Sequence, residues 1–273
     1  MIVVTGATGN VGRSLVRRLH EAGEAVTAVA RHITDADVPA GVRAVAADLA
    51  EPQSLESALH GADALFLLVA GDDPGGITAR ARAAGVRKVV LLSSQGVGTR
   101  PRAYRHAAGF EAAVAASGLD WTVLRSGGLA SNAFAWVGPV RASGVAPAPF
   151  GDVGLPFVDP DDVAAAAAVV LRGDGHRGAT YVLTGPEPTT PRQRAAALAE
   201  ALGTPVRFEE QSRQEAHEQL ARLMPVPVVE GTLDVLGEPT EEEQRVGADL
   251  PGLLGRPATP FADWARRNAP AFR

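Results

Sequence analysis

The sequence predicts an α/β fold in which helices cover both faces of a doubly wound parallel sheet, with a smaller C-terminal α/β unit as a cap. Through residue 125, short and nearly uninterrupted apolar runs alternate with amphipathic helical patterns, which is typical of strands buried on both faces. The first run leads through a glycine-rich turn directly into the first helical pattern. After residue 125 the alternation breaks down, which indicates a change of architecture.

The first part of the chain is expected to form one sheet domain, residues 1–125. Its apolar runs predict strands at residues 2–5, 25–30, 42–46, 64–69, 88–93 and 121–124. Between them the apolar spacing predicts helices at residues 11–22, 54–60, 77–84 and 103–116. The first, third and fourth of these helices end before a glycine, a residue that helix C-termini prefer.

The second part, residues 126–273, is less regular. Residues 127–160 are rich in Gly and Pro and show no clean helix, so a long irregular segment is expected. Asp159 then caps an Ala/Val-rich helix that runs to Leu171. The other patterns predict strands at residues 179–183 and 206–208 and helices at residues 190–202, 212–223, 228–236 and 260–268. This part is thus expected to return to the sheet at residues 157–185 and otherwise to build a small substrate-binding cap.

The composition excludes several classes of protein. The chain has 26 Lys and Arg against 31 Asp and Glu, a net charge of −5, so a general electrostatic grip on nucleic acid or an anionic membrane is not expected. It has no Cys, which excludes disulfides and thiol nucleophiles. The longest apolar runs, residues 64–70 and 163–171, fall short of the roughly 20 residues that span a bilayer. A cytoplasmic protein is therefore expected. The histidines show no metal-ligand spacing, so no metal is expected.

The turn Gly6–Gly12 has the pattern G-x-x-G-x-x-G. In a Rossmann-type fold, Gly6 permits the tight turn, Gly9 lets a pyrophosphate approach the backbone, and Gly12 lets the helix pack close to the strand. Free N–H groups at the start of the helix then face the anion. A plain glycine-rich turn is the alternative, but a strand before and a helix after the turn favour a dinucleotide. The expected cofactor-binding turn is completed by Thr8, Asn10 and Val11.

Two positions bear on which dinucleotide binds. Arg31 follows the second strand, where an acidic residue would bind the ribose hydroxyl of NAD and an arginine accommodates the extra phosphate of NADP. We therefore expect NADP(H) to be preferred over NAD(H), unless Arg31 is only a solvated surface residue. Asp48 follows the third strand and either accepts from the adenine amino group or caps the next turn. Further cofactor contacts are expected at Leu49, Val69, Ala70 and Ser93.

With these motifs in place, the chain resembles the NmrA-like group of NAD(P)-binding, atypical short-chain dehydrogenases/reductases nearly from end to end. The resemblance rests on the glycine turn, Asp48-Leu49, Val89–Ser94, His106, Glu111, Trp121–Arg125, Asn132, Phe157–Asp159, Asp162–Ala164 and Thr180–Pro186. It implies a Rossmann domain, a smaller C-terminal domain and a cleft between them. Members of the group resemble NADPH-dependent quinone, isoflavone or imine reductases, or redox-sensing regulators that bind the dinucleotide without turnover.

The Tyr-x-x-x-Lys pair with which short-chain dehydrogenases usually reduce carbonyls is absent. Tyr104 and Ser94 can take two of the usual places, but the residue four positions after Tyr104 is Ala108. The chain has a single lysine, Lys88, and it lies in a predicted strand. We expect Tyr104 to pack at a helix start rather than to act as an acid. Hydride transfer to a conjugated acceptor does not need the pair, because such an acceptor is already electrophilic.

His106 is the candidate catalytic proton donor, because an ordinary histidine titrates near neutral pH. It follows the loop Ser93–Gln95, and Glu111 could orient it, although a five-residue spacing is imperfect on a helix. A surface histidine is the alternative. The expected substrate contacts are Gln95, Asn132, Phe134 and Trp136, with Phe150 and Phe157 as further apolar walls or as local core.

Arg125 and the acidic run Glu241–Glu243 are the remaining charged features of note. Arg125 could bind phosphate, ribose or substrate, and Glu241–Glu243 is expected to be a solvated helix start. The leading hypothesis is an NADPH-dependent oxidoreductase that transfers hydride to a small conjugated, quinoid or aromatic acceptor. The alternatives are an NADP(H)-sensing regulator that docks a partner protein, and a tailoring enzyme with non-redox chemistry such as epimerisation. The chain is compatible with a monomer or a homodimer.

Overall fold

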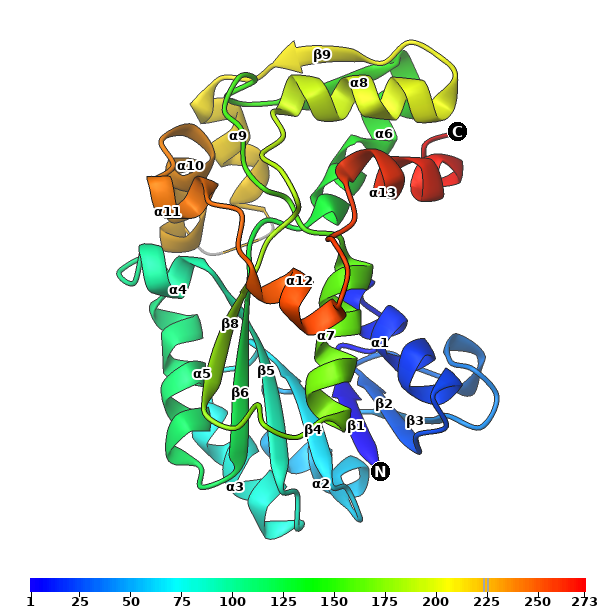
Figure 1. Ribbon diagram of the computed structural model, residues 1–273, viewed down its shortest axis with the longest axis vertical. Helices are drawn as coiled ribbons and strands as arrows, with labels where there is room; N and C mark the ends of the chain where they lie inside the picture. The colour runs from blue at the N-terminus through cyan, green and yellow to red at the C-terminus, as the bar shows by residue number, and fades with distance from the viewer. Residues whose placement is uncertain (223, 225) are drawn as a thin grey trace.

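A parallel sheet forms the lower part of the molecule in the computed structural model, which describes residues 1–222, 224 and 226–273 (Figure 1). The sheet has seven strands in the order β3-β2-β1-β4-β5-β6-β8, and every neighbouring pair is parallel. The strands are β1 (Ile2–Thr5), β2 (Val26–Ala30), β3 (Arg43–Ala46), β4 (Ala64–Leu68), β5 (Lys88–Ser94), β6 (Asp120–Ser126) and β8 (Ala179–Leu183). The strand order reverses between β1 and β4, which is where doubly wound sheets bind ligands. The predicted fold class is confirmed.

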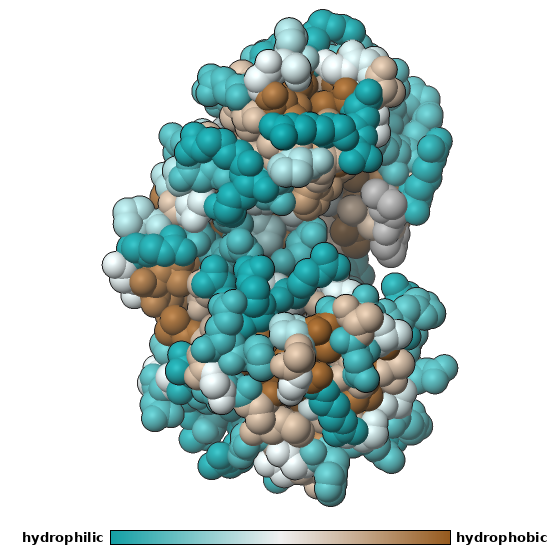
Figure 2. Space-filling view, turned by 90° about the vertical axis from the view of Figure 1, so that its right-hand side faces the viewer, coloured by the Kyte–Doolittle hydropathy of each residue, from teal (hydrophilic) through white to brown (hydrophobic). Residues whose placement is uncertain are grey.

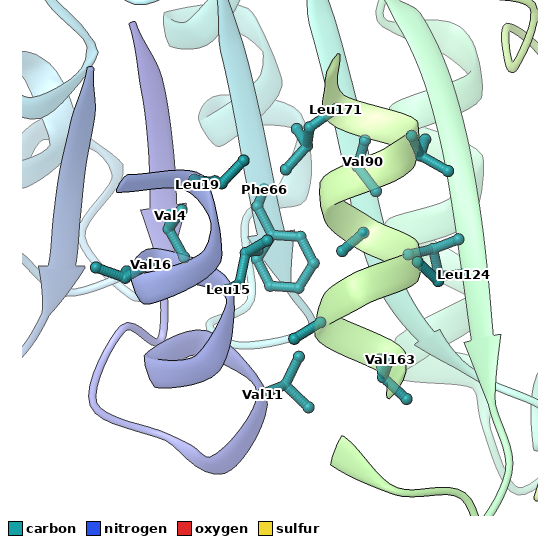
Figure 3. Packing of buried hydrophobic residues seen from close by; sticks show 14 of the residues in the cluster. Val4, Val11, Leu15, Val16, Leu19, Phe66, Val90, Leu124, Val163 and Leu171 are labelled. Atoms are coloured by element: carbon teal, nitrogen blue, oxygen red, sulfur yellow. The ribbon is translucent and has the colours of Figure 1, made fainter. Parts of the chain in front are cut away.

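Helices cover both faces of this sheet. One face carries α1 (Asn10–Glu21), α7 (Pro160–Arg172) and α12 (Asp249–Leu254), and the other carries α2 (Glu56–Leu59), α3 (Pro74–Ala83) and α5 (Arg105–Ala116). Because side chains alternate along a strand, β4 supplies both cores: Phe66 packs toward α1 and α7, while Leu65 and Leu67 pack toward α3 and α5. Figure 3 shows the ring of Phe66 beside Leu15 of α1, next to α7.

The cap lies above the sheet in Figure 1 and has its own core. Its two parallel strands, β7 (Val145–Ala148) and β9 (Arg207–Glu210), pair far apart in sequence. The helices around them are α6 (Val137–Ser143), α8 (Pro191–Leu202) and α13 (Phe261–Asn268). Aromatic side chains fill the core of the cap, among them Trp136, Phe261, Trp264 and Phe272. Figure 2 shows that the molecule narrows between the sheet below and the cap above.

Further helices complete the fold. They are the 3-10 helices η1 (Asp35–Asp37), η2 (Pro52–Leu55), η3 (Ala130–Trp136) and η4 (Ala269–Phe272), and the α-helices α4 (Gly96–Thr99), α9 (Arg213–Leu220), α10 (Val226–Gly237) and α11 (Glu241–Gln244). Their apolar residues at α9 and α10 form a small separate cluster around Val229 and Leu233. No helix in the described ranges is both long and apolar enough to cross a membrane.

Two expectations about the second part of the chain are wrong. Residues 127–160 are not irregular, because they contain η3, α6 and β7, and α6 ends at Gly144 in the left-handed conformation with φ 64°. The run Glu241–Glu243 is not a fully solvated helix start, since Glu243 is 2% exposed. The structure also adds α12, for which no helix was expected. The predicted helix 212–223 ends as α9 at Leu220, and residue 223 lies outside the described residues.

Candidate active site

The turn after β1 is closed by its own backbone. Gly6 has φ 64°, its carbonyl accepts from Gly9 N at 2.9 Å, and Ala7 N donates to Val29 O at 3.0 Å. A Cβ at position 12 would lie 2.1 Å from Gly6 O, so only glycine fits where α1 crosses the turn. The turn therefore sits tightly between β1, β2 and the start of α1, as the glycine spacing predicts.

The start of α1 is suited to an anion. Gly9 is the N-cap residue and offers no side-chain acceptor, and the first turn of α1 contains no acidic residue. The first amide N–H groups of the helix thus have no side-chain partner and carry the positive end of the helix dipole. Gly9 and Asn10 are exposed, whereas the side chain of Val11 is buried in the core, so Val11 could contribute only its backbone. A diphosphate fits this turn.

Basic side chains lie beside the turn. Arg31 is exposed and directly follows β2, whose Val29 is bonded to the turn. Arg13, which the sequence analysis did not single out, donates from Nη2 to Thr8 O at 3.0 Å. Its signal in the sequence was its position immediately after Gly12, one helical turn from the expected anion.

A second pair of loops meets at the same edge of the sheet. At position 71 a Cβ would lie 2.4 Å from Leu49 O, so Gly71, with φ 78°, brings the loop after β4 against the loop after β3. Leu49, Val69 and Ala70 therefore lie close together, as their shared role in the sequence analysis requires. Asp48 Oδ1 accepts a hydrogen bond from Ala50 N at 3.0 Å. Its side chain thus caps the turn after β3, which is one of the two roles expected for it.

A partly buried ion pair lies behind the end of β5. Ser93 Oγ donates to Glu111 Oε1 at 2.6 Å, and Arg125 binds the same carboxylate through Nε at 3.0 Å and Nη2 at 2.7 Å. Hydrogen bonding to Glu111 raises the pKa of Arg125. Glu111 therefore holds Arg125 and does not orient His106. Arg125 and the hydroxyl of Ser93 are committed to this network, which braces the ends of β5 and β6.

His106 lies on the surface of α5. Its side chain is 50% exposed, with Nδ1 at 4.0 Å from Asp72 Oδ1, and its ring packs against the edge of Phe110 with the centroids 5.2 Å apart. It is not among the residues that line the cavity described next. This placement matches the alternative reading of a surface helix histidine.

A cavity of about 480 Å³ lies between the carboxyl ends of β5 and β6 and the cap. Three of the predicted substrate contacts, Gln95, Asn132 and Trp136, line it. Phe134 does not: it packs in the core of the cap against Trp264, at 5.1 Å between ring centroids. Further lining residues are Ser94, Gly96, Thr99, Ser126, Gly127, Gly128, Pro147, Leu155, Phe157, Leu220, Met224, Thr232, Val235 and Leu236.

Two of the predicted contacts have structural bonds of their own. Trp136 donates from Nε1 to Pro147 O at 2.7 Å, and Gln95 donates from Nε2 to Glu242 O at 3.2 Å. The first bond fixes the indole in the cavity wall, and the second ties α11 to the edge of the sheet.

Tyr104 forms part of the wall, which the sequence analysis did not expect. It is the N-cap residue of α5, and its ring covers Gly96 so closely that a Cβ there would lie 2.4 Å from the ring. Burial raises the pKa of Tyr104. A phenol in this environment stays protonated at neutral pH and can donate a hydrogen bond.

Two other ionisable side chains line the cavity in the described residues, Arg194 and Glu243. Glu243 is neutralised by Arg100, which binds it through Nε and Nη2 at 2.9 Å each. Arg194 is 6% exposed, and its guanidinium carbon lies 3.8 Å from the ring centroid of Phe157. The sequence carried one signal for Arg194: it occupies the same helix face as the buried Ala195 and Leu198.

Lys88 lies at the opposite end of β5 from this cavity. Its Nζ donates to the carbonyls of Val170, Leu171 and Gly173 at 3.4, 3.2 and 2.6 Å. These are acceptors at the C-terminal end of α7, where helix carbonyls lack helical partners. The single lysine of the chain is thus a cap for α7 and does not reach Tyr104.

Comparisons with known proteins agree with this geometry. A family model described as NAD(P)H-binding matches residues 6–173. The chain is 40% identical over 286 residues to a (4-alkanoyl-5-oxo-2,5-dihydrofuran-3-yl)methyl phosphate reductase of Streptomyces griseus, covering 100% of this chain and 99% of that protein. It is 32% identical over 289 residues to an NAD(P)H azoreductase of Xenophilus azovorans, covering 100% and 99% of the two chains.

A solved structure shows the same arrangement. The NADPH-dependent quinone oxidoreductase QOR2 of Escherichia coli, complexed with NADPH, superposes with a TM-score of 0.79 at 27% identity, covering 98% of this chain and 99% of that chain. The match extends through the cap as well as the sheet. The chain belongs to the NmrA-like, quinone-oxidoreductase-like family of NAD(P)H-binding proteins and is an NAD(P)H-dependent oxidoreductase.

Proposed function

We propose that this protein uses NADPH to reduce a small acceptor whose double bond or ring is conjugated to an electron-withdrawing group. The observation that carries the proposal is that the cavity at the ends of β5 and β6 is largely apolar, while the single lysine of the chain is held at the other end of β5. Without a lysine beside Tyr104, the site favours acceptors that need little proton transfer in the rate-limiting step.

The glycine turn and its neighbours would hold the cofactor. The backbone amides of Asn10 and Val11 would bind the diphosphate, while Arg31 and Arg13 would bind the additional phosphate of NADPH. Leu49, Val69 and Ala70 would flank the adenosine. When bound, NADPH supplies the hydride. The preference for NADPH over NADH rests on the two arginines, since the described residues beside the turn offer no carboxylate immediately after β2.

The relatives support a conjugated acceptor. The name of the Streptomyces griseus protein denotes an unsaturated lactone that carries an alkanoyl group and a methyl phosphate, and the name of the Xenophilus azovorans protein denotes an azo compound. In each, the developing negative charge is delocalised onto oxygen or nitrogen by the acceptor itself. The chain then needs only to hold the acceptor at near-attack distance and to donate hydrogen bonds to its oxygen. Tyr104 and Asn132 are the donors in the wall that we assign to this task.

The test is consumption of NADPH with a panel of acceptors: naphthoquinone, an acetyl-substituted butenolide, an azo dye and, as a carbonyl without conjugation, cyclohexanecarbaldehyde. We expect the conjugated acceptors to be reduced and cyclohexanecarbaldehyde to be left unchanged. The reaction without protein corrects for spontaneous reduction of the quinone. Failure of every conjugated acceptor to oxidise NADPH, or preferential reduction of cyclohexanecarbaldehyde, would contradict the proposal.

A further inference from the structure

Arg194 is an unusual residue to find on the buried face of a helix. Thr190 caps α8 and fixes its start, and the face that then points inward carries Pro191, Arg194, Ala195 and Leu198. Of these, Ala195 and Leu198 are apolar residues that pack in the core of the cap. Arg194 occupies a core position with a charged side chain, and long charged residues are almost never this buried unless they are paired.

No carboxylate compensates Arg194 in the part of the chain that the structure describes. Its Nε has no hydrogen-bond partner there, although it is fully buried. Burial alone lowers the pKa of Arg194 to about 9, with no neighbouring charge opposing that shift. Two other partly buried arginines contrast with it: Arg100 is paired with Glu243 and Arg125 with Glu111.

Aromatic rings hold the guanidinium in place instead. Its carbon lies 3.8 Å from the centroid of Phe157, 5.7 Å from that of Trp136 and 6.0 Å from that of Phe261. Gly128 permits this arrangement, since a Cβ there would lie 2.8 Å from the ring of Phe157. Stacking contacts the face of the guanidinium and leaves the N–H groups on its edge available to an acceptor.

The same side chain lines the cavity that also contains Gln95, Tyr104 and Asn132. A buried, charged donor that faces a largely apolar cavity lowers stability, so it is expected where a ligand compensates it. Glu243 is the other charged lining residue in the described chain, and Arg100 already neutralises it. The charge left without a counterion in the cavity is therefore positive.

We propose that Arg194 binds an anionic group of the substrate, so that the acceptor reduced by this protein carries a phosphate, sulfonate or carboxylate next to its conjugated part. This inference rests on the proposed function for one point, that the occupant of the cavity is the substrate. Bidentate pairing of a guanidinium with such an oxyanion in an apolar site is short, directional and stronger than a neutral hydrogen bond.

The first experiment measures binding and needs no turnover. Protein saturated with NADP⁺ is titrated in a calorimeter with naphthalene sulfonate, naphthyl phosphate and the neutral hydroxymethyl naphthalene. We expect at least one anion to bind about 10-fold or more tightly than the neutral probe. Equal affinity for the neutral probe and both anions would overturn the proposal, and this comparison uses only the wild-type protein.

Variants then assign the effect to the side chain. Arg194→Met should abolish the preference for the anion, while keeping affinity for hydroxymethyl naphthalene and unfolding at a higher temperature than the wild type. Arg192→Met is the matched control on the same helix, because Arg192 stacks on Phe208 but pairs with Asp152 and Glu210 at the surface. Arg192→Met should retain the preference. If Arg194→Met instead weakens binding of NADPH itself, the anion is that of the cofactor and the proposal is wrong.

A kinetic comparison separates this proposal from the proposed function. Naphthoquinone and naphthoquinone sulfonate are offered to the wild type and to Arg194→Met with NADPH. The proposal predicts a lower KM for the sulfonate in the wild type only. Reduction of both quinones with the same KM in both proteins would contradict the anion site and leave the reductase intact. Reduction of neither quinone, with anion-selective binding preserved, would contradict the proposed function and leave Arg194 as an anion site.

Discussion

The glycine turn and the cavity under the cap are both suited to a negatively charged ligand, but they are built in different ways. The turn uses a continuous segment, Gly6–Gly12, whose backbone amides carry no net charge and stay near water. The cavity uses side chains from β5 to α11, including one buried guanidinium at Arg194. A backbone site costs little stability when empty, whereas a desolvated charge costs several kcal/mol unless it is compensated. This difference is the reason why we assign the charge in the cavity to selection among acceptors.

The largest effect is expected at the turn. Gly9→Val would place a branched side chain over the exposed amides, and a Cβ at this position already lies 3.2 Å from Gly6 O. We expect binding of NADPH and NADH to fall by more than about 100-fold, measured by calorimetry. Gly109→Val in α5 is the control, since no heavy atom other than those of its chain neighbours and the backbone of its own helix lies within 4 Å of a Cβ there. Unchanged affinity in Gly9→Val would show that the turn does not bind the diphosphate.

The second prediction concerns Glu243, a charge in the cavity that, unlike Arg194, is compensated by a partner. Arg100→Met leaves the carboxylate of Glu243, which is 2% exposed, without its partner. Removing one member of a buried pair costs about 3–5 kcal/mol in the free energy of unfolding. We expect urea denaturation near neutral pH to show a loss of this size. A loss smaller than that of the surface control Arg87→Met would mean that the pair is solvated.

The pH dependence of this loss has a defined sign. Burial by itself would raise the pKa of Glu243, but hydrogen bonds from Arg100 and from Thr240 N lower it below 4.5. A carboxyl whose folded pKa is lowered contributes stability above its unfolded pKa and loses it as the pH falls through the folded pKa. The difference between wild type and Arg100→Met should therefore shrink below pH 4.5. A difference that stays constant as the pH falls well below 4.5 would contradict the pairing.

The third prediction concerns the other end of the cofactor site. Arg31→Ala removes a charge-assisted contact to the extra phosphate of NADPH, worth about 1.5–3 kcal/mol, or roughly 10–100-fold in affinity. Affinity for NADH should change little. Calorimetry with both nucleotides measures the ratio, with Arg43→Ala at the start of β3 as the control. Equal losses for the two nucleotides would remove the argument for recognition of the phosphate by Arg31.

The smallest effect is expected at Tyr104. If its hydroxyl only donates a hydrogen bond, Tyr104→Phe should lower kcat/KM for a quinone by less than about 10-fold, below the 10²–10⁴-fold typical of a general acid. Because burial raises the pKa of Tyr104, the rate should show no break from this phenol between neutral pH and pH 10. A 1000-fold loss, or such a break, would make Tyr104 a general acid after all.

The sequence could predict the turn and the sheet because both depend on neighbouring residues. The strand β1 was expected at its observed bounds, and Gly6, Gly9 and Gly12 act within one short segment. Arg31 could be placed because it immediately follows a predictable strand. These features are fixed by local apolar spacing and by glycine conformation, which the chain displays directly.

The cavity could not be predicted in the same way, because its residues meet only in the folded chain. The sequence alone indicates a solvated Glu243, because its partner Arg100 lies 143 residues away in the chain. Its position near His106 in the sequence suggests Glu111 as the partner of that histidine. In the folded chain, β6 instead brings Arg125 against Glu111. In the segment 127–160, α6 could not be predicted because it is short and contains Pro139. The strand β7 could not be predicted because it pairs with β9, which is distant in the sequence. Arg194 had a local signal, a charge on an apolar helix face, but its aromatic neighbours come from η3, the segment before α7, and α13.

The central claim is that NADPH held at the turn reduces an acceptor held in the cavity. Its most direct test mixes stoichiometric protein and NADPH with naphthoquinone sulfonate in a single turnover, using NADPH with hydrogen or with deuterium at the reactive carbon of the nicotinamide. We predict oxidation of the nicotinamide far faster than without protein, slowed by deuterium, and lost in Gly9→Val. Oxidation no faster than the protein-free reaction, or equally fast in Gly9→Val, would contradict the claim.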